Sequence, residues 1–189
     1  MKHLFYAAIC ALLLLPAAPP AMAQTQDVYE SVRNHITCYP FGIDEIGRGD
    51  NASGIAVWKG CFAEDYQFTI NVSAGEPVVC PGEKCPFPKE MSSIEKRAAF
   101  ARKAFDSSEF IRTSHHLTNV TILSADADRA EVKSYIQAWH LKKDGTSLIA
   151  PSVWEVSLAK RGGQWRIVKE NLTIVFAGIL QARAPARKE

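Results

Sequence analysis

The sequence predicts an α+β fold in which helices come first and an antiparallel sheet follows. The first half of the chain carries apolar residues at steps of three and four, the spacing of an amphipathic helix. The second half alternates between two faces in long runs separated by Asp-Gly and Gly-Gly turns, as hairpin-connected strands do. The 189 residues are 47% hydrophobic and 22% charged, which suits one globular domain with helices on one face of its sheet.

The first 23 residues are predicted to be a signal peptide. A polar start at Lys2 and His3 precedes the apolar stretch Leu4–Leu15, which is too short for a comfortable membrane span. The run Ala21-Met22-Ala23 then fits the small-x-small cleavage rule, with an uncleaved anchor as the alternative. We expect a signal peptide at 1–23, one domain at 24–180 and a frayed tail at 181–189, in a periplasmic or secreted protein that is free of the membrane after cleavage.

Four cysteines remain once Cys10 is removed with this segment, and an exported protein meets an oxidising compartment, which favours disulfides. A metal site is the weaker alternative, because the spacing is not Cys-x-x-Cys. Cys80 and Cys85 could close a small loop, a rigid flap near a pocket mouth or a sheet edge, and Cys38 with Cys61 would then join two helical segments. Four cysteines allow three connectivities, so the pairing stays open.

The first predicted helix covers the region from Val28 to Ile46, where apolar residues recur every three or four positions. Pro40 and Gly42 interrupt this pattern. Because proline lacks the amide N–H that a helix interior uses, we expect a kink or a short break at that point.

A second helix is expected to begin at a cap formed by Asp50 and Asn51 and to end near Asp65, with Trp58 and Phe62 facing inward. The rest of this half follows local composition. We expect a strand at Tyr66–Val72, a proline-rich loop at Ala74–Lys89, and a third helix from Ser92 or Ser93 to Phe105.

The second half predicts a meander of antiparallel strands. Asp144-Gly145 and Gly162-Gly163 are residue pairs that favour tight hairpins, and Ser124–Asp128 forms a further turn. We expect strands at Ser114–Leu123, Ala130–Lys142, Val153–Lys160 and Gln164–Ala177.

Charge and motifs exclude several functions. The net charge of +2, without a Lys/Arg run or an aromatic-basic stripe, gives no support for nucleic-acid binding. The sequence contains no nucleophile elbow, zinc-protease helix, phosphate loop or dinucleotide glycine pattern. No strongly charged partner is implied.

Segments spread over residues 26 to 176 nevertheless follow a known pattern. They are Ile43-Asp44 with Gly49-Asp50 and Phe62-Ala-Glu-Asp65; Ser114-His115-His116-Leu-Thr-Asn119-Val; and Lys133-Ser-Tyr135 with Asp144-Gly145 and Gly162-Gly-Gln-Trp165-Arg-Ile. Their order and spacing resemble the nuclear transport factor 2-like superfamily and, within it, the SnoaL-like branch that includes scytalone dehydratase. The resemblance implies a cone, in which a curved antiparallel sheet wraps around the N-terminal helices and an apolar pocket takes a small hydrophobic molecule.

Strand alternation puts His140 on the more apolar face of its predicted strand, together with Ser134. A lone histidine on such a face is often a hydrogen-bonded core residue. The resemblance implies more: His115 matches the cavity base of the family, Asp44 the carboxylate that orients it, and His140 a second histidine. A carboxylate on one imidazole nitrogen fixes the tautomer and makes the other nitrogen more basic, so this set suits removal of a proton next to a carbonyl.

Other polar groups would complete the pocket. Ser152 or Tyr39 could protonate a leaving hydroxyl or polarise a carbonyl. His116 is the alternative to His115, because a slip of one residue in register exchanges the two, and Asn119 could instead bond only to backbone. The expected substrate contacts are Tyr39, Asn119, Ser134, Ser152 and Trp154.

Two functions stay open. The first is a cofactor-independent dehydratase, isomerase or cyclase that acts on a small hydrophobic substrate by His–Asp acid–base chemistry. The second is a non-catalytic module of the same fold that binds a small molecule or a protein. In either case we expect no metal and no cofactor, and an outward strand face with Tyr135, Trp139 and Trp154 or its neighbours that could support a homodimer. Convergence of the carboxylate and both imidazoles in one cavity would favour the enzyme.

Overall fold

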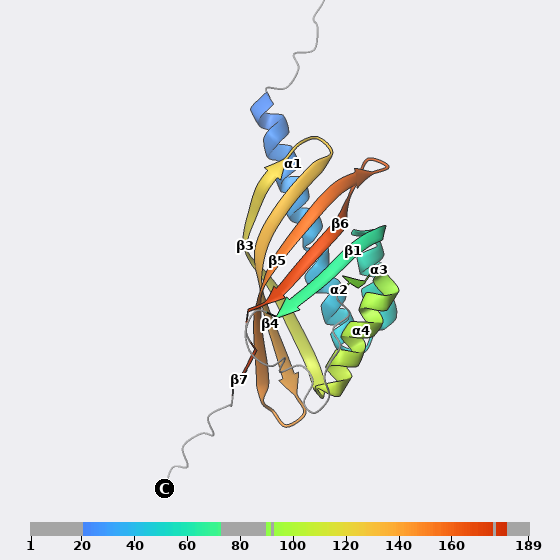
Figure 1. Ribbon diagram of the computed structural model, residues 1–189, viewed down its shortest axis with the longest axis vertical. Helices are drawn as coiled ribbons and strands as arrows, with labels where there is room; N and C mark the ends of the chain where they lie inside the picture. The colour runs from blue at the N-terminus through green and yellow to red at the C-terminus, as the bar shows by residue number, and fades with distance from the viewer. Residues whose placement is uncertain (1–20, 73–89, 92, 176, 181–189) are drawn as a thin grey trace, which may run out of the picture.

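The protein is a layer of helices packed against one curved sheet, which confirms the predicted α+β class and its helices-first order (Figure 1). The computed structural model describes residues 21–72, 90–91, 93–175 and 177–180. The predicted flap closed by Cys80 and Cys85 and the tail at 181–189 lie outside the described residues. The elements are α1 (Ala21–Ile36), α2 (Cys38–Gly47), α3 (Asn51–Lys59), β1 (Phe62–Val72), β2 (Glu90–Met91), α4 (Ile94–Ser107), β3 (Phe110–Ala125), β4 (Arg129–Lys142), β5 (Ser147–Arg161), β6 (Gln164–Ile174) and β7 (Gly178–Leu180).

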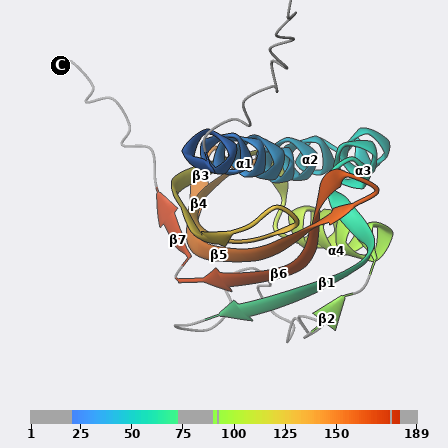
Figure 2. The same ribbon diagram turned by 90° about the horizontal axis from the view of Figure 1, so that it is seen from above.

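The sheet has the strand order β2-β1-β6-β5-β4-β3, with β7 paired to β5. Strands β3 to β6 form the predicted antiparallel meander. Strand β1 joins β6 in parallel, so the sheet is not antiparallel throughout as predicted. Figure 2 shows α1, α2 and α3 in a row across the open side of the curved sheet, which is the cone implied by the resemblance.

The break in the long N-terminal helix falls at Thr37, three residues before the predicted position at Pro40. In a continuous helix the ring of Pro40 would meet the carbonyl group of Ile36, and one hydrogen bond would be lost. Because α2 restarts at Cys38, Pro40 lies in its first turn, where an amide N–H has no partner within the helix. The Thr37 hydroxyl donates to the carbonyl oxygen of Asn34 at 2.7 Å, which closes the end of α1.

Helix α3 begins as predicted and ends earlier than predicted. The Asp50 carboxylate accepts the backbone N–H of Ser53 at 3.0 Å, which is the expected cap. The helix stops at Lys59 rather than near Asp65, and Phe62 is buried as the first residue of β1. The reason is long-range, because the chain here pairs with β6, a partner that no local pattern reveals.

Strand β5 begins six residues before the predicted start and runs through Pro151. Proline removes a ladder donor, so it is usually excluded from the interior of a sheet. Pro151 accepts the N–H of Val175 through its carbonyl oxygen at 3.0 Å, so its missing N–H faces the same side. On that side of β5, pairing with β6 ends at Ser152 and pairing with β7 begins at Ile149. Pro151 lies between these two paired segments, where the sheet does not need its N–H.

The two faces of β4 differ as predicted. Its outer face carries Tyr135 and Trp139, which are 46% and 40% exposed, whereas Trp154 of the neighbouring strand is fully buried and takes no part in that face. A homodimer across this face stays a prediction. Within the described ranges no helix has both the length and the apolar character needed to cross a membrane. The buried residues of β4 are Ala130, Val132, Ser134, Ile136, Ala138 and His140.

The close approach of α2 to β3 depends on a glycine. A Cβ atom at Gly47 would lie 2.1 Å from Oγ1 of Thr113, far inside van der Waals contact. Asp44 lies almost one turn before Gly47 on the same helix, so the approach that the glycine permits also brings the Asp44 carboxylate to β3.

Gly47→Ala should therefore lower the free energy of unfolding by about 1–3 kcal/mol, the usual cost of overpacking. In Gly47→Ala/Thr113→Ala the hydroxyl and methyl groups are gone, and the nearest atom is the Cβ of residue 113 at 3.0 Å. Chemical denaturation should show that the double variant loses less unfolding free energy than the two single variants lose in sum. Additive losses would show that the contact with Thr113 is not what requires glycine.

Candidate functional site

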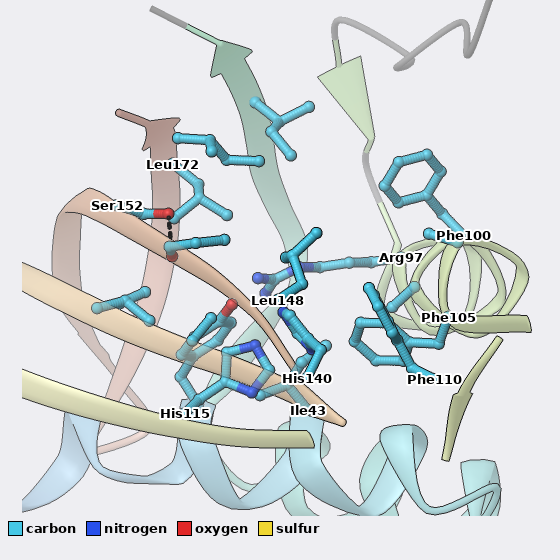
Figure 3. A pocket seen from close by; sticks show the side chains of 18 of the residues that line it. Ile43, Arg97, Phe100, Phe105, Phe110, His115, His140, Leu148, Ser152 and Leu172 are labelled. Carbon is cyan, nitrogen blue, oxygen red and sulfur yellow. Dashed lines mark hydrogen bonds between the residues drawn. The ribbon is translucent and has the colours of Figure 1, made fainter. Parts of the chain in front are cut away.

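A cavity of about 110 Å³ lies between helices α2 and α4 and the inner face of the sheet (Figure 3). Most of its lining is aliphatic or aromatic, with Phe105, Phe110 and Leu148 among the side chains that face it. An apolar hollow with a few polar groups is typical of small-molecule sites. The polar side chains in the lining are Tyr39, Arg97, His115, His140 and Ser152.

Asp44 and His115 form a tightly bonded pair at this cavity. Oδ1 of Asp44 lies 2.7 Å from Nδ1 of His115 and 3.1 Å from Oγ1 of Thr113, and Oδ2 accepts the backbone N–H of His115 at 3.1 Å. A carboxylate only accepts hydrogen bonds, so the proton of a neutral His115 lies on Nδ1 and the lone pair on Nε2. The imidazole lines the cavity and the carboxylate lies behind it.

His140 lies diagonally across from His115 on the neighbouring strand. The ring centroids of the two imidazoles are 5.3 Å apart, and the His140 ring stacks on Phe110 at 4.6 Å. Its Nδ1 is buried and has no hydrogen-bond partner among the described residues. Burial, and to a lesser extent the charge of His115, lowers the pKa of His140 to about 3. At neutral pH His140 is therefore an uncharged imidazole that can exchange hydrogen bonds with a ligand.

Two of the expected substrate contacts line the cavity. Tyr39 is buried against Trp154, with ring centroids 5.0 Å apart, and burial raises the pKa of its hydroxyl. Ser152 points its hydroxyl at the carbonyl oxygen of Ala150, at 3.3 Å. Both side chains line the cavity, so they can contact a bound molecule without a movement of the backbone.

The other three expected contacts do not line the cavity. Asn119 is exposed at a bulge of β3 with a φ of 52°, and the extra residue turns its side chain away from the face that His115 occupies. Ser134 and Trp154 are cross-strand partners on the inner face, and both are buried outside the cavity. His116 is exposed and bonds to Oγ of Ser114 at 2.9 Å, so it is not the inward histidine.

The cavity also has a buried ion pair that was not predicted from the sequence. Nη1 and Nη2 of Arg97 lie 2.6 and 2.7 Å from the carboxylate oxygens of Glu170, and Nε1 of Trp154 donates to the same carboxylate at 2.6 Å. Burial raises the pKa of Glu170, and the Arg97 charge opposes that rise. Burial is the largest influence on the pKa of Arg97 and acts to lower it. The interactions with Glu170, Tyr66 and Tyr39 together outweigh burial and raise that pKa, which keeps the guanidinium charged.

Weak signals for both residues exist in the sequence. Arg97 lies three residues after Ile94 and four before Ala101, on the apolar stripe of α4. Glu170 alternates with Leu172 and Ile174 at the end of β6. Alternation counted from the start of β6, however, predicts that Glu170 is exposed, because an irregularity at Val168 shifts the register.

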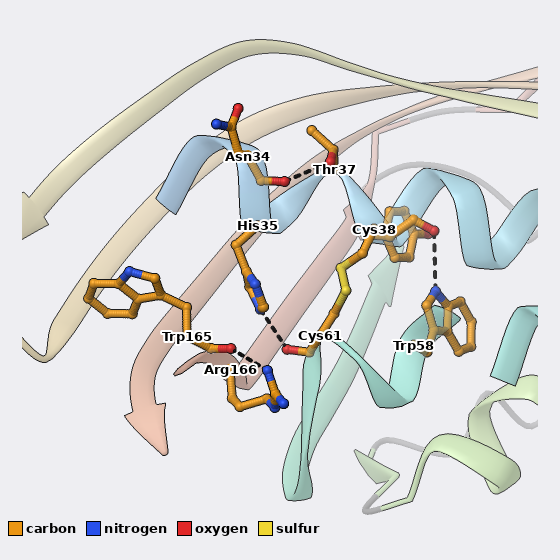
Figure 4. Close-up of a disulfide and its surroundings, with 9 residues drawn as sticks. Asn34, His35, Thr37, Cys38, Trp58, Cys61, Trp165 and Arg166 are labelled. Carbon is orange, nitrogen blue, oxygen red and sulfur yellow. Dashed lines mark hydrogen bonds between the residues drawn. A yellow bond between two sulfur atoms is a disulfide. The ribbon is translucent and has the colours of Figure 1, made fainter. Parts of the chain in front are cut away.

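A disulfide next to the cavity joins Cys38 to Cys61, with their Cα atoms 6.3 Å apart (Figure 4). This is the pairing that the sequence analysis considered, although Cys61 precedes β1 rather than lying in a helix. Nε2 of His35 bonds to the carbonyl oxygen of Cys61 at 2.9 Å, and Trp58 donates to the carbonyl oxygen of Tyr39 at 3.2 Å. The backbone that carries Tyr39 is thus fixed at the cavity wall. In the described part of the chain, His, Cys, Asp and Glu side chains form no group of three that could hold a metal ion.

Comparison with known proteins adds a family and a fold. The family described as SnoaL-like domain matches residues 26–171. A hexachlorocyclohexane dehydrochlorinase, LinA-type3, from Novosphingobium barchaimii is similar in structure, with a TM-score of 0.62, 12% identity, and coverage of 89% of this chain and 100% of that chain. A candidate scytalone dehydratase from Novosphingobium aromaticivorans gives a TM-score of 0.59, 17% identity, and coverage of 89% and 99%. Comparison with curated proteins gave no match. At these identities the structural similarities show the fold alone.

The pH dependence of stability should reveal the buried neutral His140. An unfolded chain binds a proton at this residue near pH 6.5, whereas the folded protein does so only near pH 3. The stabilising effect is therefore complete above pH 6.5 and lost as the pH falls, with a slope of up to about 1.4 kcal/mol per pH unit. Denaturation between pH 7 and 4 should show a shallower loss in His140→Phe. The exposed His116→Gln should keep the wild-type slope, and equal slopes in all three proteins would contradict the assignment.

Removing the disulfide should cost about 3 kcal/mol of unfolding free energy, because Cys38 and Cys61 close a loop with a sequence separation of 23 residues. Chemical denaturation of Cys38→Ala/Cys61→Ala, without reductant, should give a lower midpoint and a folded baseline like that of the wild type. An unchanged midpoint would show that the crosslink does not constrain the unfolded chain.

Proposed function

The chain belongs to the SnoaL-like domain family, and on this premise we propose that it is a cofactor-independent enzyme that processes a small hydrophobic molecule with His115 as general base. One observation carries the proposal: the 2.7 Å contact between Nδ1 of His115 and Oδ1 of Asp44, made beside an apolar cavity. A hydrogen-bonded carboxylate makes the opposite imidazole nitrogen more basic and stabilises the imidazolium that forms.

The reaction class follows from what these groups can exchange. Nε2 of His115 removes a proton from carbon, and the electron pair that is released forms a C=C bond or an enolate. In an elimination, the bond to a leaving group on the next carbon breaks, and His115 can return its proton to a departing hydroxide. In an isomerisation, the same proton returns to a different carbon.

His140 and Tyr39 act as hydrogen-bonding groups in this proposal. Because the pKa of His140 is low, its role is to donate a hydrogen bond from a neutral imidazole to the oxygen on which charge develops, rather than to supply a proton as imidazolium. Tyr39 is held neutral by its raised pKa and can donate from its hydroxyl. The lining is mostly apolar, and each of these contacts is stronger in such surroundings than in water.

The disulfide supports the proposal that the protein works in an oxidising compartment, periplasmic or secreted after removal of residues 1–23. The dehydrochlorinase and dehydratase names of the similar structures suit an elimination. The non-catalytic alternative of the same fold predicts that a molecule binds in the cavity and leaves unchanged.

Deuterium exchange tests the proposal without knowledge of the natural substrate. In D₂O the protein should accelerate exchange of the C–H next to the carbonyl in small cyclic ketones, followed by mass spectrometry, and His115→Gln and Asp44→Asn should each lower the rate by about 10²–10⁴-fold. The matched control His116→Gln alters an exposed histidine on the same strand and should keep the wild-type rate. Thermal unfolding of each variant shows whether it is folded.

Two results would remove the enzyme proposal. Full exchange activity in folded Asp44→Asn would show that the carboxylate does not act on His115. Binding of the ketones in the cavity without any accelerated exchange would favour the binding module instead.

A further inference from the structure

The ion pair of Arg97 and Glu170 is costly where it lies. Their side chains are only 4% and 0% exposed. Removing two charges from water costs several kcal/mol per ion, and well-packed apolar residues of the same volume often give equal or greater stability. Stability alone therefore does not account for a charged pair at the wall of an apolar cavity that also holds His115 and His140.

The guanidinium has donors beyond those that Glu170 uses. The carboxylate contacts Nη1 and Nη2, and the hydroxyl groups of Tyr39 and Tyr66 also hydrogen-bond with the guanidinium. A guanidinium carries five N–H groups, more than these partners use, so it can donate a further hydrogen bond to a ligand. Arg97 extends from α4 toward the cavity that it lines (Figure 3). Aromatic faces hold the cation in place with its Cζ 4.3–5.4 Å from the ring centroids of Phe68, Trp58, Tyr39 and Phe62.

The charges around the cavity favour a neutral ligand. Glu170 already balances Arg97, and the Asp44 carboxylate already pairs with His115. A ligand carboxylate would add a negative charge for which the described part of this wall holds no further cation, which is expensive in an apolar site. A neutral carbonyl oxygen can accept a hydrogen bond from Arg97 without adding charge.

The cavity also limits the size of the ligand. Its volume of about 110 Å³ is somewhat smaller than the ~150 Å³ of an engineered cavity that binds benzene. A molecule of about the size of one six-membered ring is therefore the largest ligand that we expect the cavity to hold. His140, whose buried Nδ1 has no hydrogen-bond partner among the described residues, is a second polar side chain in the lining.

We infer that Arg97, backed by Glu170, forms a subsite for an uncharged acceptor oxygen, and that the cavity selects a single-ring ketone over both an apolar ring and a ring carboxylate. This inference rests on the proposed function only in taking the cavity as the place where the ligand binds. Arg97 is thereby a specificity-determining residue, and Glu170 is a positioning residue that orients the guanidinium.

Three probes of similar size test the selection by binding alone: cyclohexanone, methylenecyclohexane and cyclohexanecarboxylate. The first two differ in one group, an oxygen in place of a methylene carbon. NMR titration of the full chain should give at least about tenfold tighter binding of cyclohexanone than of methylenecyclohexane, in line with a hydrogen bond to a charged donor, and the weakest binding for the carboxylate. Equal affinity for the first two probes, or preference for the carboxylate, would overturn the inference.

A double variant assigns the selection to the ion pair. Arg97→Met/Glu170→Gln removes both charges together, so that neither is left buried alone, and the new amide oxygen can still accept the N–H of Trp154. It should bind methylenecyclohexane as the wild type does and lose the tenfold preference for the ketone. A folded double variant that keeps the preference would show that the pair is only structural. If this variant does not fold, the relative affinities of the three probes for the wild type still test the inference.

The two proposals fail in different ways. His115→Gln should lose deuterium exchange and keep the preference for cyclohexanone, since Arg97 and Glu170 are unchanged. If the wild type prefers the ketone but does not accelerate exchange, only the enzyme proposal is refuted. If it accelerates exchange without preferring the ketone, only the Arg97 subsite is refuted.

Discussion

The architecture of the site depends on how closely α2 approaches β3. At Gly47 the helix lies so near Thr113 that a single added carbon would not fit. This contact sets the Asp44 carboxylate against both the backbone and the ring of His115, so one carboxylate fixes the strand to the helix and fixes the tautomer of the imidazole. A wider separation would leave the same residues in the same order along the chain, without the hydrogen bonds that give them a chemical role.

The cavity is apolar, yet two polar side chains of its lining, His115 and Arg97, are held by carboxylates of different character, one partly buried and one fully buried. Asp44 holds an imidazole whose charge can change, whereas Glu170 holds a guanidinium whose charge cannot. The first pair is suited to moving a proton. The second is suited to offering hydrogen bonds of fixed direction, because aromatic rings and the indole N–H of Trp154 confine it. In low-dielectric surroundings both arrangements act more strongly than they would at the surface.

Simple alternation identified some inward residues and failed at others, and the difference has one cause. In β4 the pairing with β5 is regular from Arg129 to Leu141, and alternation places His140 correctly. Irregularities in β3 and β6 add a residue to one strand, after which every side chain exchanges faces. Asn119 is therefore exposed although it shares the parity of His115, and Glu170 is buried although the start of its strand predicts exposure.

The α+β class, the meander, the cap at Asp50 and the inward face of β4 could be predicted from the amino-acid sequence, because they follow from period, turn residues and capping, which are local properties. Two features were decided by the tertiary structure: the parallel pairing of β1 with β6 and the meeting of Arg97 with Glu170. Each depends on groups that are distant in the chain. Such contacts exist only once the helices have packed against the curved sheet.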